Sequence, residues 1–65
     1  MDIMAIRLRT LREKMGMSQA KLAKEIGVTQ ASVNRYETAR VTPPAEVLLF
    51  YADRFDVSLD YIFGR

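Results

Sequence analysis

The sequence contains no cysteine and no histidine. Without cysteine it has neither disulfides nor thiolate metal ligands. The absence of histidine excludes the usual zinc sites and the Ser/His and Cys/His catalytic pairs. Long apolar runs are also missing, because the longest uncharged one, residues 47–52, is far short of the roughly 20 residues that a membrane helix requires. We therefore expect a cytoplasmic protein without metal or cofactor, and not an enzyme.

The chain is short, and its charge is unevenly distributed. Its 65 residues leave room for one domain, spanning 1–65. The net charge of +2 combines +4 over residues 1–40 with −2 over residues 41–65. A basic segment beside an acidic one suits a surface that meets a polyanion, although an ordinary solvated surface would look the same.

Turn and capping residues divide the chain into short helices. Ser18, Thr29 and Ser58 are good N-caps, and glycines stand where helices should end. No sustained alternation of apolar and polar residues indicates a strand. The pattern predicts an all-α domain with helices over 3–15, 19–26, 30–38, 44–55 and 59–63.

Apolar residues repeat at helical spacing within these segments, which predicts one buried face for each helix. We expect the core to contain Met4, Leu8, Leu11 and Met15 from the first helix, Leu22, Ala23 and Ile26 from the second, Val33 and Tyr36 from the third, and Leu48, Tyr51, Ala52 and Phe55 from the fourth. Val47, Leu49 and Phe50 lie off the predicted face of the fourth helix and leave some apolar surface over.

Residues 19–38, QAKLAKEIGVTQASVNRYET, have the features of a helix-turn-helix. Ala23 is small where two helices must approach closely. Gly27 can adopt the positive φ that the sharp turn requires. The second helix of such a pair is exposed on one side and fits the major groove of DNA.

Almost the whole chain resembles the Cro/CI-type, or XRE-like, helix-turn-helix family. The segment LRTLREKMGMSQAKLAKEIGVTQASVNRYE is similar to the first three helices of that family, and TPPAEVLLFYADRFDVSLDYIFG to its fourth and fifth. The resemblance implies a compact five-helix, lambda-repressor-like DNA-binding fold. Two positions depart from the pattern, because Ala39 and Asp56 stand where the family commonly has glycine. Asp tolerates a left-handed backbone better than most residues, which suits Asp56. Ala39 bears only on the expected conformation of its own loop and not on the expected fold.

The resemblance makes residues 30–38 the recognition helix. Its side chains suit base reading, since Gln and Asn can pair with adenine, Arg with guanine, and Ala can pack on a thymine methyl. The expected base contacts are Gln30, Ala31, Asn34 and Arg35, with Asn34 open to a backbone role instead. The expected contacts to the DNA backbone are Ser18, Gln19, Thr29, Ser32 and Arg40. The resemblance also implies an ion pair between Arg12 and Glu37 that ties the first helix to the end of the third.

These residues predict a sequence-specific transcriptional regulator of the repressor type. By resemblance it binds an inverted repeat in double-stranded DNA as a homodimer, with half-sites about 10 bp apart. The dimer contact is expected in the C-terminal region, at Val47, Leu49, Phe50 and Phe63. A protein-interaction module on the same fold, antitoxin-like or antirepressor-like, is the alternative, but it would have no need of the base-reading set on the third helix.

Overall fold

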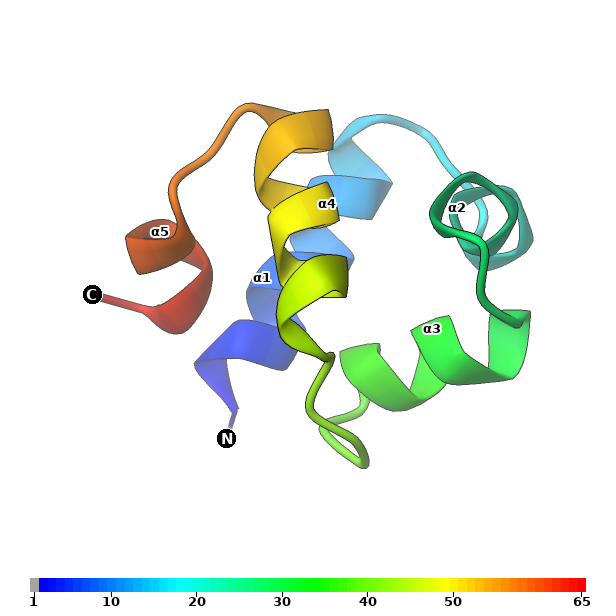
Figure 1. Cartoon of the computed structure of the whole chain (residues 1–65), viewed down its shortest axis with the longest axis horizontal. Coiled ribbons are helices and arrows are strands. Elements are labelled where there is room, and N and C mark those ends of the chain that lie inside the picture. The colour runs from blue at the N-terminus through cyan, green and yellow to red at the C-terminus, as the bar shows by residue number, and fades with distance from the viewer. Residues whose placement is uncertain (1) are drawn as a thin grey trace.

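The computed structural model describes residues 2–65 and contains five α-helices over that range. They are α1 (Ile3–Lys14), α2 (Gln19–Ile26), α3 (Gln30–Glu37), α4 (Ala45–Phe55) and α5 (Leu59–Phe63). Figure 1 shows α2 and α3 on one side of the molecule and α5 on the other, with α1 and α4 between them. The all-α, five-helix fold is therefore as predicted.

The helices begin where capping side chains satisfy free backbone N–H groups. Ser18, Thr29 and Ser58 each accept a hydrogen bond from the backbone N–H three residues further along the chain. Asp2 caps α1 in the same way, at 3.0 Å. Because these bonds replace water at groups that lack a partner within the helix, they fix each start to a particular residue.

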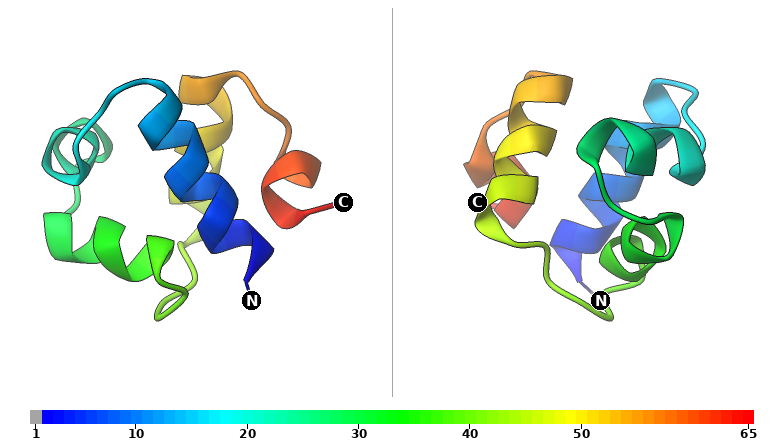
Figure 2. Two further views of the ribbon diagram at one scale, coloured as in Figure 1. Left: turned by 180° about the vertical axis from the view of Figure 1, so that it is seen from behind. Right: turned by 45° about the vertical axis from the view of Figure 1, so that its right-hand side comes forward.

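The core joins all five helices at one place. Its largest fully buried side chains come one from each helix: Leu8, Leu22, Val33, Tyr51 and Ile62. Both views in Figure 2 show α1 running through the middle of the molecule. The buried side of α3 therefore faces the core, while its other side is left to solvent.

The exit of α1 differs from the prediction. Met15, expected in the core, is 54% exposed, and Met17 is buried in its place. Met15 is the C-cap of α1, and the chain then turns through Gly16 at a φ of +66°. Because the helical repeat ends before this turn, its spacing no longer tells which methionine points inward. Arg12 then fixes the new chain direction by donating to the Met17 carbonyl at 2.7 Å.

The buried face of α4 is wider than the sequence indicated. Val47 was expected to be left over, but it is only 6% exposed and belongs to the core. It lines a groove with Ile26 and Val28, at the turn between α2 and α3, because α4 packs against this turn as well as against the core. Phe50 lines the same groove and is half-buried. Leu49 and Phe63 remain exposed, whereas Val47 has little surface left for a contact with a second copy.

Two non-glycine residues adopt the left-handed backbone where the sequence departs from its family pattern. Ala39 has a φ of +61° and Asp56 a φ of +54°. Asp56 ends α4 as its C-cap, and Ala39 follows the C-cap of α3. Both positions thus adopt the left-handed backbone that usually favours glycine, although neither residue is a glycine. Within residues 2–65 no helix is both long enough and apolar enough to cross a membrane.

Candidate DNA-binding surface

The turn between α2 and α3 sets the angle of the helix pair. It consists of residues 27–29, in which Gly27 has a φ of +89°. The N–H groups of Gly27 and Val28 both donate to the carbonyl of Ala23, at 2.9 and 3.0 Å. These two hydrogen bonds to one carbonyl close the end of α2. The chain therefore turns sharply there, and α3 starts directly after Thr29.

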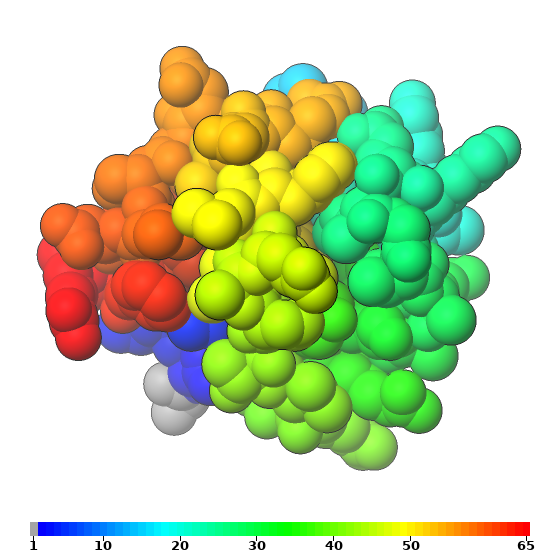
Figure 3. Space-filling view, viewed as in Figure 1, coloured from blue at the N-terminus to red at the C-terminus, as the bar shows by residue number. Residues whose placement is uncertain are grey.

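The outward face of α3 is polar and open to solvent. Val33 and Tyr36 point into the core from this helix. The opposite side presents the four expected base-contacting residues, all of them exposed: Gln30, Ala31, Asn34 and Arg35. In the space-filling view of Figure 3, α3 lies at the surface along one edge of the molecule. The helix is therefore free to be approached from outside over this whole face.

The residues expected at the DNA backbone surround this face but differ in how free they are. Ser18 accepts the N–H of Lys21 through Oγ, which leaves its hydroxyl proton able to donate elsewhere. Thr29 donates to the hydroxyl of Ser32 at 3.0 Å, and Ser32 is half-buried. Arg40 is exposed in the loop after α3. Ser18 and Arg40 are therefore the more available of these groups.

Arg12 and Glu37 join α1 to the last turn of α3. The Arg12 Nε and Nη2 atoms donate to the two carboxylate oxygens of Glu37, at 2.7 and 2.9 Å. The side chains are only 12% and 2% exposed, so the pair is largely removed from water. The hydrogen bond to Glu37 raises the pKa of Arg12 above its ordinary value. Such a two-pronged pair fixes geometry as well as charge, and here it sets the position of α3 against α1.

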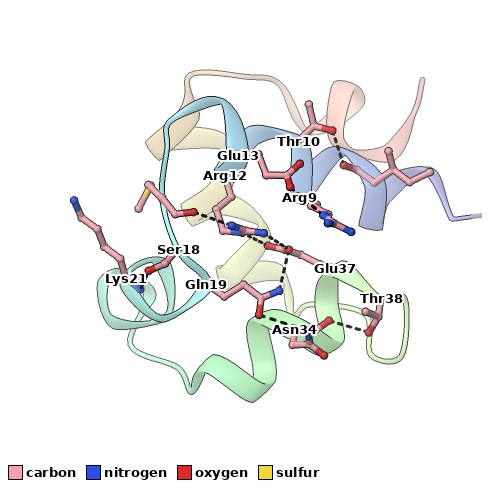
Figure 4. Close-up of polar contacts among 12 residues, drawn as sticks. Arg9, Thr10, Arg12, Glu13, Ser18, Gln19, Lys21, Asn34, Glu37 and Thr38 are labelled. Atoms are coloured by element: carbon pink, nitrogen blue, oxygen red, sulfur yellow. Dashed lines mark hydrogen bonds and ion pairs between the residues drawn. The ribbon is translucent and has the colours of Figure 1, made fainter.

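Gln19 extends this ion pair to the exposed face of α3, which the sequence did not predict. Its Nε2 donates to Glu37 at 3.1 Å, and its Oε1 accepts from the Nδ2 of Asn34 at 3.5 Å. Figure 4 shows Gln19 between the two, with the dashed contacts running from Arg12 to Asn34. These residues are 15 to 25 positions apart in the sequence, and no local pattern relates them.

Within residues 2–65 no group of three or more carboxylates is placed to hold an ion. One acidic residue of α2, Glu25, instead pairs with Arg54 of α4 at 2.9 Å. This partly exposed pair joins α2 to α4.

Comparison with known proteins identifies the family. The sequence model of the helix-turn-helix family matches residues 8–62. The chain belongs to this helix-turn-helix family. The Cro/CI-type relationship expected from the sequence is thereby confirmed. Relatives of this helix-turn-helix type carry the names of transcriptional regulators and repressors.

Several helix-turn-helix relatives are regulators by name. The chain is 40% identical over 58 residues to the uncharacterized HTH-type transcriptional regulator YobD of Bacillus subtilis, covering 89% of this chain and 52% of YobD. It is 36% identical over 59 residues to the cryptic phage CTXphi transcriptional repressor RstR of Vibrio cholerae, covering 91% of this chain and 53% of RstR. The chain thus spans about half the length of these relatives.

A solved helix-turn-helix structure has the same fold. It is the c2 repressor of the Salmonella phage P22, in complex with synthetic operator 9T in the presence of Tl+. The TM-score is 0.87 at 30% identity, over 97% of this chain and 96% of that chain. All five helices of the present structure thus have a place in a known repressor fold.

Proposed function

We propose that the chain binds double-stranded DNA sequence-specifically, with α3 in the major groove. The observation that carries this proposal is the exposed face of α3, which presents two amides and a guanidinium to solvent. The likeness to the P22 c2 repressor, which is solved in complex with a synthetic operator, supports DNA binding by this fold.

Each residue on this face has a role suited to its chemistry. Gln30 and Asn34 present amides that match the donor and acceptor of adenine, and Arg35 presents the fork that matches guanine. Ala31 is small and apolar, as contact with a thymine methyl requires. We assign the base contacts to these four residues.

The flanking groups hold the DNA backbone in this proposal. Gln19 lies in the first turn of α2, where free N–H groups and the helix dipole favour a phosphate. Ser18, Thr29, Ser32 and Arg40 provide further hydroxyl and guanidinium donors around α3. Residues 1–40, which include α1 to α3, carry a net charge of +4. This charge favours association with the polyanion at every sequence, while the face of α3 selects among sequences.

We further propose that the protein acts as a repressor in the cytoplasm, bound as a homodimer to an inverted repeat. Two copies related by a two-fold axis would place their α3 helices in successive major grooves, about one helical turn apart. The exposed Leu49 and Phe63, with half-buried Phe50, provide apolar surface for contact between the copies. Repression follows if the occupied site overlaps the place where polymerase binds.

Selection of bound sequences from a random DNA library tests the proposal. Enrichment of a short inverted repeat is expected, with affinity that falls steeply as salt is raised, because phosphate contacts release counterions. Binding without enrichment would refute sequence-specific reading. Absent or salt-insensitive binding would instead favour the interaction module.

Arg35→Ala should relax the preference at a single base pair and weaken binding of the selected site by about 1–3 kcal/mol. Arg40→Gln is a matched control, because it removes a positive charge outside the reading face. It should weaken binding about equally at all sequences and reduce the salt dependence. Fluorescence anisotropy on a set of singly substituted sites distinguishes the two patterns. Loss of equal size at every site in Arg35→Ala would contradict base reading by Arg35.

A further inference from the structure

We propose that Gln19 determines base preference through Asn34, as a positioning residue that holds the Asn34 amide in one orientation. This inference rests on the base contact proposed for Asn34. It assigns to Gln19 a role that differs from gripping a phosphate, since a phosphate contact acts equally on every sequence.

Glu37 determines the orientation of the Gln19 amide. An ionised carboxylate has acceptors and no donor, so only the NH2 side of an amide can bond to it. Arg12 donates a hydrogen bond to each of the two Glu37 oxygens, at 2.7 and 2.9 Å. The side chain of Glu37 is 2% exposed and therefore has little freedom to turn away. The Gln19 amide is thus obliged to place Nε2 toward Glu37, at 3.1 Å.

The Gln19 amide in turn determines the orientation of the Asn34 amide. With Nε2 of Gln19 toward Glu37, its Oε1 faces the opposite way and accepts from Asn34 Nδ2 at 3.5 Å. That distance is long for a hydrogen bond, but only the amino side of Asn34 can make it. The Oδ1 atom and the second N–H of Asn34 are left for another partner. The close-up in Figure 4 shows both amides in this arrangement, with Gln19 reaching from α2 to α3.

Base reading depends on which end of the amide faces the DNA. Adenine presents an acceptor at N7 and a donor at N6, and a flipped amide would offer its donor and acceptor in the reverse order. Without Gln19, the exposed Asn34 amide could turn over freely. Gln19 therefore fixes the pattern that Asn34 offers, although it need not touch a base itself.

A double-mutant comparison tests this role. Gln19→Ala, Asn34→Ala and the double variant are measured against the selected operator and against sites with one base pair substituted. Gln19→Ala should lose at least about threefold of the preference at the base pair that Asn34 reads. The double variant should lose no more preference there than Asn34→Ala alone. Gln19→Met, which keeps the length of the side chain without its amide, should behave like Gln19→Ala.

Two controls separate positioning from general weakening. Gln30→Ala combined with Gln19→Ala should be additive, because within residues 2–65 the Gln19 amide is hydrogen-bonded to Glu37 and Asn34 and not to Gln30. Arg40→Gln should lower affinity without changing the preference at that base pair. Circular dichroism melting of each variant checks that the fold is intact.

The outcomes are distinguishable. If Asn34→Ala alters the preference at one base pair but both Gln19 variants retain it, the positioning role is overturned and the base contact stands. If Asn34→Ala leaves every preference unchanged, the base contact fails, and the positioning role fails with it. Loss of the same preference in Asn34→Ala and in both Gln19 variants supports the proposal.

Discussion

Glu37 is the residue whose loss should damage the fold most. Removing its carboxylate leaves the guanidinium of Arg12, only 12% exposed, without a counter-charge. An uncompensated buried charge costs about 3–5 kcal/mol, which is a large part of the stability of a domain this size. We predict that Glu37→Ala lowers the free energy of unfolding by that amount, as measured by urea denaturation.

Glu13→Ala is the matched control, because Glu13 pairs with Arg9 at 3.2 Å on the surface of α1. Both of those side chains are more than half exposed, so the pair should contribute less than about 1 kcal/mol. If Glu37→Ala had the same small effect as Glu13→Ala, the buried ion pair would have no role in stability.

Tyr51 carries a buried hydroxyl that has no hydrogen-bond partner within residues 2–65. Its ring is part of the core and packs against Phe55. Tyr51→Phe keeps the ring and removes the unsatisfied group. We predict that the free energy of unfolding stays the same or rises by up to about 1 kcal/mol. A loss of more than about 1 kcal/mol in urea denaturation would show that the hydroxyl makes a stabilising contact.

The same residue gives the domain a dependence on alkaline pH. Burial raises the pKa of Tyr51, so the folded state keeps its proton at a pH where the unfolded state has lost it. This contribution is fully present below the unfolded pKa of about 10 and is lost as the pH rises above it. Between about pH 8 and pH 11, the free energy of unfolding should therefore fall less in Tyr51→Phe than in the unsubstituted protein.

At the scale of elements, the loops after α3 and α4 hold a left-handed residue that is not glycine. Ala39→Gly should raise the free energy of unfolding by about 0.5–1 kcal/mol, because a Cβ is unfavourable at a φ of +61°. Asp56→Gly is the natural comparison, at a φ of +54°. Its gain should be smaller, since Asp adopts this conformation more readily. Thermal melting of both variants measures the difference, and a destabilised Ala39→Gly would contradict the prediction.

The helices themselves could be predicted because their signals are local. Ser18, Thr29 and Ser58 each cap a helix start through a bond that spans three residues. Gly27 adopts the positive φ that the turn requires. Such signals depend on neighbours in the sequence, so the helix bounds agree with the prediction to within one residue.

The contacts between elements could not be predicted in the same way. Met17 replaces Met15 in the core because of the direction that the chain takes after α1. Val47 is buried because α4 packs on the turn between α2 and α3. The Gln19 contacts with Glu37 and Asn34 depend on how α2 and α3 cross. In all these cases the residue that makes the contact is distant in the sequence, and the spacing of apolar residues along a helix does not indicate it.

At the scale of the whole molecule, α3 lies at one edge and α5 at the opposite side, as Figure 1 shows. If two copies bind as the proposed dimer, the distance between their α3 helices is fixed by the protein. We predict that moving one half-site by about five base pairs, half a helical turn, abolishes tight binding. Moving it by a full turn should weaken binding less. Gel-shift titration compares the three spacings, and equal affinity for all of them would indicate that the copies bind independently.

The placement of one large buried side chain from every helix at a shared centre has a consequence for motion. No helix can detach without opening the packing of the other four, so partial unfolding leaves no intact remainder. The domain should therefore pass between folded and unfolded states in a single step. A surface helix of eight residues would be mostly unwound in water by itself. Within this domain α3 is held in place by the packing of the whole fold. It is therefore already helical before it meets its target.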